Sequence, residues 1–206
     1  MPGLFDLPPE IRNAIYELIF RVDNVKDGAR EVDLSPIWNG RSVLDLLLTC
    51  RQIHRESEAM FYNLNHLRYP AAHSVYTPFI LSLQSTRRKA LTALTVSCST
   101  VDEALHEINH HLTLAPNLST LHMELPVHLW RSDALAVAWA KKAHIPLKTM
   151  KLKEISIVQP DSRAIKNLVS GGAANNDYVF ITERALLERA RDLAKVVEGI
   201  LRNGVV

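Results

Sequence analysis

The segment SVLDLLLTCRQIHRESEAMFYNLNHL, residues 42–67, is the longest uninterrupted helical pattern in this chain. Its apolar residues recur at helical spacing and predict one buried stripe made of Leu46, Cys50, Ile53, Met60 and Leu64. Ser42 and Asp45 have the spacing of a capping box, which marks where the helix is expected to begin. Because such an apolar stripe must be covered, a second amphipathic element is expected to pack against this helix.

Residues 8–22 are the strongest candidate for that cover. Pro8 and Pro9 fit the first turn of a helix, and Asp6 just before them can act as its cap. The apolar positions predicted to face the long helix are Ile11, Ala14, Ile15, Leu18 and Val22. An ion pair between Arg51 and either Glu10 or Glu17 is expected to hold the two helices together.

Tyr16 and Phe20 fall on nearly the opposite side of this first helix from the predicted stripe. Two interpretations follow. The aromatic rings pack beneath the next loop or a later helix, as large apolar side chains usually do. Alternatively they are exposed anchors for a partner protein, since aromatic residues are enriched at the centres of interfaces.

The rest of the chain predicts a mixed α/β architecture. Residues 22–34 contain an Asp-Gly turn signal between two short strand-like runs and predict a hairpin insert. Further on, strands are expected over 67–70, 90–97, 117–125, 152–158 and 178–181, with helices over 75–83, 101–114, 127–144, 161–169 and 183–202. Two of these strand–helix units resemble leucine-rich-repeat logic but are too few and too irregular to predict a solenoid. We expect a helical module over 1–69 and an α/β portion over 70–206 that ends in a closing helix, packed together as one unit.

Composition bounds the possible functions. The chain has 206 residues, with 24 basic against 22 acidic residues, and this balance gives no indication of a nucleic-acid or membrane partner. No apolar run approaches the roughly 20 residues that span a bilayer. The N-terminal residues lack the pattern of a secretory signal, and two distant cysteines are too few for a disulfide framework. We therefore expect an intracellular protein of the cytoplasm or nucleus.

Catalytic patterns are few. His106, Glu107 and His110 fit the HExxH pattern of zinc hydrolases, in which the glutamate acts as base. The helix that carries them has its apolar stripe on the opposite side, at Val101, Leu105, Ile108 and Leu112, so both histidines are expected to face water. No third-ligand motif follows, and the chain has no phosphate-binding glycine loop and no nucleophile elbow. We predict no catalytic residue, no metal ligand and no cofactor.

Two segments carry a family resemblance. LPPEIRNAIYELIF at 7–20 and LLLTCRQIHRESEAMFYNLNHL at 46–67 resemble the F-box-like domain proteins abundant in filamentous fungi. The residues that match are Leu7, Pro8, Glu10, Ile11, Arg12, Ile15 and Tyr16, followed by Leu47, Leu48, Cys50, Arg51, Gln52, Ile53, Glu56, Phe61, Tyr62 and Asn65. The insert between the two helices is longer than in a standard F-box. The resemblance implies docking to the Skp adaptor of a cullin ubiquitin ligase, with Leu7 and Pro8 matching the Leu-Pro pair that contacts it.

The expected function is therefore non-enzymatic protein binding, as an F-box-like adaptor, with Leu7, Pro8, Tyr16 and Phe20 as the protein-binding residues. A structural or scaffold subunit without a ligase link is the alternative, with its partner on the closing helix or near Trp130 and Trp139. A zinc-dependent hydrolase that uses the HExxH pattern comes third.

Overall fold

The computed structural model describes residues 3–21, 25–26, 29–33, 47, 49–71, 79–126, 129, 132–158 and 183–203. The predicted helix over 161–169 and the predicted strand over 178–181 lie outside these residues, as do Ser42, Asp45 and Trp130. Within the described part of the chain, no helix has the length and apolar character needed to cross a membrane.

One sheet runs through the molecule, and its strands lie in the order in which they occur in the sequence. The first pair is antiparallel and confirms the predicted hairpin, while every later neighbour is parallel. The strands are β1 (Val25–Lys26), β2 (Ala29–Asp33), β3 (His66–Ala71), β4 (Ala93–Cys98), β5 (Thr120–Glu124) and β6 (Glu154–Val158). The mixed α/β class is confirmed.

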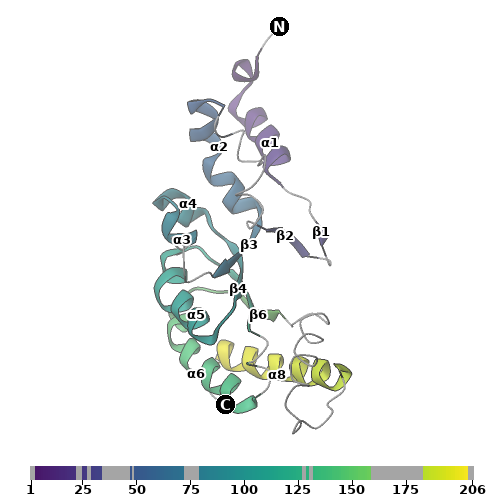
Figure 1. Ribbon diagram of the computed structural model, residues 1–206. Helices are drawn as coiled ribbons and strands as arrows, with labels where there is room; N and C mark the ends of the chain where they lie inside the picture. The colour runs from purple at the N-terminus through teal and green to yellow at the C-terminus, as the bar shows by residue number, and fades with distance from the viewer. Residues whose placement is uncertain are drawn as a thin grey trace.

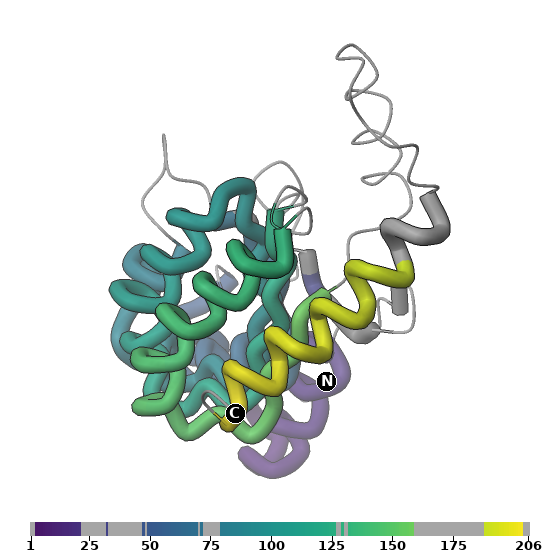
Figure 2. Tube along the Cα trace, turned by 90° about the horizontal axis from the view of Figure 1, so that it is seen from below, coloured from purple at the N-terminus to yellow at the C-terminus, as the bar shows by residue number. Residues whose placement is uncertain are grey.

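Helices connect these strands along one side of the sheet (Figure 1). Parallel strands in sequential order with crossovers of one hand place every connection on the same face. Seen from below, the helices follow one another side by side along a curve, and the last helix lies next to its end (Figure 2). The helices are α1 (Pro9–Phe20), α2 (Arg51–Leu64), α3 (Phe79–Ser82), α4 (Ser85–Ala90), α5 (Val101–His106), α6 (Asp133–Thr149) and α8 (Glu183–Asn203). A wider turn, Glu107–His111, and a short 3-10 turn, Leu112–Leu114, extend α5.

The pairing is more regular than the sequence pattern indicated. His66 on β3, Ala93 on β4 and Thr120 on β5 lie side by side in the sheet. The same number of residues separates His66 from Ala93 and Ala93 from Thr120. Each step falls within the roughly 20–29 residues that are typical of leucine-rich repeats. The sequence showed two such units, but the structure continues the stack across β2 and β6.

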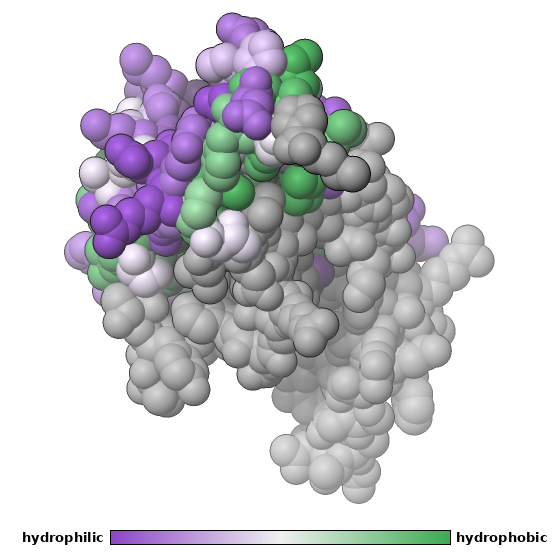
Figure 3. All heavy atoms as spheres, turned by 90° about the horizontal axis from the view of Figure 1, so that it is seen from above, coloured by the Kyte–Doolittle hydropathy of each residue, from purple (hydrophilic) through white to green (hydrophobic). Residues whose placement is uncertain are grey.

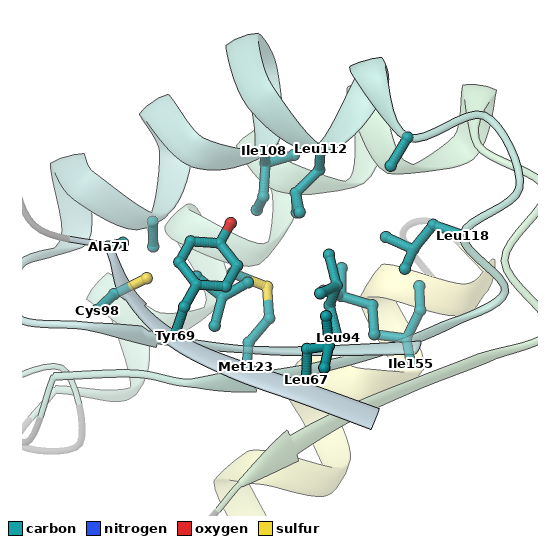
Figure 4. Close-up of a cluster of buried hydrophobic side chains, with 14 of the residues drawn as sticks. Leu67, Tyr69, Ala71, Leu94, Cys98, Ile108, Leu112, Leu118, Met123 and Ile155 are labelled. Atoms are coloured by element: carbon teal, nitrogen blue, oxygen red, sulfur yellow. The ribbon is translucent and has the colours of Figure 1, made fainter. Parts of the chain in front are cut away.

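The core lies between the sheet and the helices. Successive strands place Val32, Leu67, Leu94, Leu121 and Ile155 in one row, and all five are buried. Of these, Leu67, Leu94 and Ile155 lie on the side of the sheet that faces Ile108 and Leu112 of the α5 segment (Figure 4). Because buried residues from α1 to α8 form one cluster, and because the expected boundary at 69/70 falls inside β3, the two portions share a single core.

The long helix is shorter than predicted. The backbone of Cys50 is extended, and its Sγ accepts a hydrogen bond from the Ile53 N–H at 3.4 Å, so Cys50 caps α2 and no continuous helix passes through it. Asn65 ends the helix, and the apolar residues beyond it follow the two-residue period of β3. The expectation of one helix over 42–67 was therefore wrong at both ends.

The buried side of α1 was also predicted wrongly. Arg12, Tyr16 and Phe20 are buried, whereas Ile11 is 50% and Leu18 is 82% exposed. The Tyr16 and Phe20 rings are 0% exposed, and aromatic side chains bury about 150–250 Å² each. Arg12 and Tyr16 also find hydrogen-bond partners on α2, which the pattern of one helix cannot show.

The closing helix protects the open edge of the sheet, and its predicted span of 183–202 is confirmed. β6 has no further strand beyond it among the described residues. Glu198 Oε1 accepts a hydrogen bond from the Ile157 N–H at 2.7 Å, and Arg202 Nη2 donates to the Ile155 carbonyl at 2.9 Å. These side chains satisfy edge groups that would otherwise be available for pairing with another strand.

Candidate protein-binding surface

Glu56 is the centre of the contact between α1 and α2. Arg12 donates to both of its carboxylate oxygens, with Nη2 to Oε1 at 2.7 Å and Nε to Oε2 at 3.0 Å. The Tyr16 hydroxyl donates to Oε2 at 3.0 Å, and Gln52 donates to Oε1 at 2.9 Å. An ion pair between the helices was predicted, but through Arg51, which is exposed. Arg12 and Glu56 make that pair instead.

The network fixes the charge of each member. The hydrogen bond from Arg12, followed by that from Gln52, lowers the pKa of Glu56 to about 2. The same bond to Glu56 raises the pKa of Arg12, and burial raises the pKa of Tyr16. Glu56 is therefore an anion and Tyr16 a neutral donor throughout the physiological range, and the bonds between them are charge-assisted.

A second polar contact closes the other end of the helix pair. Asn65, which is buried, donates from Nδ2 to the carbonyl of Phe20 at 2.7 Å and to that of Phe61 at 2.8 Å. The Phe20 carbonyl is the last of α1, where no intrahelical donor remains, and the Phe61 carbonyl lies one turn before Asn65 on α2. Arg12, Tyr16, Glu56 and Asn65 all belong to the residues that carry the family resemblance, so this part of the motif holds the two helices together.

The predicted protein-binding residues divide into two groups. Tyr16 and Phe20 are 0% exposed, so they are interior residues of the helix pair and are not available as surface anchors. That part of the prediction is corrected. Leu7 is half-buried and Pro8 is exposed, both at the start of α1. The carbonyl of Leu7 accepts from Arg12 Nη1 at 2.7 Å, so the network also fixes the backbone of this pair.

The outer side of α1 carries large apolar residues that the sequence analysis assigned to the core. Leu18 is 82% exposed, Ile11 50% and Ile19 43%, while Phe5 just before the helix is 46% exposed. Seen from above, apolar side chains reach the surface at the end of the molecule where α1 and α2 lie (Figure 3). The spacing of Arg12, Tyr16 and Phe20, four residues apart each time, is the signal that could have identified the buried side.

The HExxH pattern does not form a zinc site of the hydrolase type. His106 and His110 are exposed, as predicted, with ring centroids 4.7 Å apart. Glu107 is buried on the other side, where it accepts hydrogen bonds from the Tyr69 hydroxyl and from His111 Nδ1, the latter at 2.7 Å. It therefore cannot act as base on water held between the two histidines. No cluster of metal-ligating residues occurs elsewhere in the described ranges.

Trp139, named for the alternative scaffold interface, is 2% exposed and belongs to the core. Its partner in that proposal, Trp130, lies outside the described residues. The face of the sheet turned away from the helices is polar. There Arg68 Nη2 lies 2.7 Å from the Glu124 carboxylate, and the rings of His66 and His122 have centroids 4.5 Å apart.

Comparison with known proteins adds nothing to this geometry, because no family model, no curated protein and no solved structure matches the chain.

Proposed function

We propose that this chain is a non-enzymatic protein-interaction module that docks a Skp-type adaptor of a cullin ubiquitin ligase through the outer side of α1. One observation supports this proposal above others. The part-buried Arg12–Glu56 contact fixes one side of α1, and the opposite side leaves Leu18 and Ile11 exposed beside Pro8. A helix that is held rigidly and presents large apolar residues is suited to receive a partner.

The chemistry of this surface agrees with a protein partner. Exposed apolar residues scattered singly are ordinary, whereas several on one side of one helix mark an interaction surface. Burial of one leucine side chain such as Leu18 contributes on the order of 2 kcal/mol. Leu7 and Pro8 lie at the start of the same helix, where the resemblance places the adaptor contact.

The test is a binding titration of the full chain against a purified Skp-type adaptor. We expect the wild-type chain to bind, and Leu18→Asp to weaken binding by at least about tenfold, because it places a charge in an apolar contact. Pro8→Ala is expected to weaken binding as well. Ile145→Asp is the matched control, since Ile145 is 70% exposed on α6, away from α1. Absence of wild-type binding, or equal losses for Leu18→Asp and Ile145→Asp, would contradict the proposal.

A further inference from the structure

We infer that the side of the sheet formed by the N-terminal ends of its parallel strands binds an acidic segment of a partner protein. The cations that define this basic edge are Arg88, Lys89, Lys148, Lys151 and Lys153. This surface is distinct from the outer side of α1, and the inference does not depend on adaptor docking.

Hydrogen bonds place Lys89 and Lys153 at this edge, and the other three cations lie within five residues of one or the other in the sequence. The Ser119 N–H donates to the Thr92 carbonyl at 2.9 Å, and the Lys153 N–H donates to the Ser119 carbonyl at 2.8 Å. The hydrogen-bonded ladder between neighbouring strands therefore extends to the residues just before β4, β5 and β6. Asn117 Nδ2 donates to the Lys89 carbonyl at 2.7 Å, which ties the end of α4 to the same edge.

Carboxylates are scarce along this edge. Residues 134–153 contain five lysines and no acid, and residues 59–101 contain no acid either. Arg87, next to the basic edge, is already paired with Glu58, at 2.8 Å. Among the described residues, none of the five basic-edge cations takes part in an ion pair. Glu154 is the nearest acid in sequence, and its side chain lies 3.8 Å from His122 Nε2.

Stabilisation of helix ends explains only part of this charge. The negative dipole ends of α4 and α6 point to this edge, and cations in their last turns offset them. That accounts for Arg88, Lys89 and Lys148. Lys151 and Lys153 lie beyond Thr149, where α6 has ended, and both are exposed. Stabilisation of a helix end therefore does not explain the positive charge of these two lysines.

The spacing suits an extended acidic segment. Neighbouring strands lie about 4.8 Å apart, so β4 and β6 are separated by about 10 Å. An extended chain rises about 3.3 Å per residue, and roughly three of its residues therefore span the interval. Four of the five cations are lysines, which attract carboxylates as point charges, whereas arginine is the residue favoured for bidentate recognition of phosphates and nucleic acids.

The experiment measures binding of a fluorescein-labelled 12-residue poly-glutamate peptide to the full chain, by anisotropy, at several salt concentrations. The triple variant Lys148→Gln, Lys151→Gln, Lys153→Gln is expected to weaken binding by about tenfold and to reduce the salt dependence. The control triple Arg51→Gln, Arg191→Gln, Lys195→Gln removes the same charge from exposed positions on α2 and α8. We expect it to change binding less than about twofold. Circular dichroism verifies that both variants are folded.

Three results would overturn the inference. Equal losses in the two triple variants would show that bulk charge, and not the basic edge, attracts the peptide. Tighter binding of a 20-base-pair DNA duplex than of the peptide would assign the edge to nucleic acid. Tighter binding of phosphatidylserine vesicles would assign it to a lipid surface.

Discussion

At the residue scale, polar side chains decide which side of α1 is buried. The sequence analysis ranked positions by hydrophobicity and therefore assigned Ile11 and Leu18 to the core. Arg12 is buried because Glu56, forty-four residues away, accepts two of its hydrogen bonds. An ion pair between the helices could be predicted from the sequence, but its members could not. The pairing depends on where two separate helices meet, and no local pattern contains that information.

Glu56→Gln tests this contact through pH. Because the pKa of Glu56 falls to about 2 in the folded state, its contribution to stability is present above its ordinary pKa of 4.5. That contribution is lost as the pH falls from 4.5 toward 2. We expect wild type to have the higher urea midpoint at pH 7, and the difference from Glu56→Gln to shrink across this window. A difference that stays constant from pH 7 to pH 2 would contradict the assigned role.

Tyr69→Phe tests the buried hydrogen-bond network around Glu107. Burial, together with the Glu107 carboxylate, holds the pKa of Tyr69 well above its ordinary value, so the hydroxyl remains a donor. Its removal leaves a buried carboxylate oxygen of Glu107 without this bond. We expect a loss of about 1–3 kcal/mol in the free energy of unfolding, measured by urea denaturation. An unchanged free energy of unfolding would show that the bond is unimportant.

At the element scale, the existence of the helices and strands was predicted better than their limits. Thr100 and Glu103 form the capping box of α5, close to the predicted start. Local signals of this kind are visible in the sequence because donor and acceptor lie within one turn. The start of α2 was missed because the apolar period runs through Cys50, whereas the extended backbone there interrupts the helix. A period alone does not reveal such a break.

Asn65→Ala tests how the ends of α1 and α2 are joined. The amide donates to the carbonyl of Phe20, the last residue of α1, and to the carbonyl of Phe61, one turn before Asn65 on α2. We expect a loss of about 1–3 kcal/mol in the free energy of unfolding. Asn63→Ala is the control, because Asn63 is exposed on the same helix and its side chain makes no hydrogen bond among the described residues, while Thr92 donates to its backbone carbonyl. Similar losses in the two variants would remove the special role of Asn65.

At the scale of the whole molecule, the sequence predicted alternating strands and helices but not a single stack. Strand patterns at 90–97, 117–125 and 152–158 identified β4, β5 and β6. Their order in the sheet depends on pairing between distant segments, which periodicity does not determine. Charged residues at the helix ends match the direction of the helix dipoles. Asp102, Glu103 and Asp133 lie at helix starts, and Arg88 and Lys148 lie at helix ends, which follows from parallel helix dipoles.

A single core predicts a single unfolding transition. Leu121 is fully buried on β5, between Leu94 of β4 and Ile155 of β6 in the row that runs from β2 to β6. Leu121→Ala is expected to destabilise the chain by about 2–5 kcal/mol, since it removes three buried carbon atoms and leaves a cavity. Because the core is shared, hydrogen exchange is expected to accelerate in α1 and α8 together with β5. If residues 1–69 instead form an independent domain, the variant will leave exchange in α1 unchanged and two transitions will appear on denaturation. That outcome would separate the helix pair from the stack, and the outer side of α1 would then belong to a unit that folds without the basic edge.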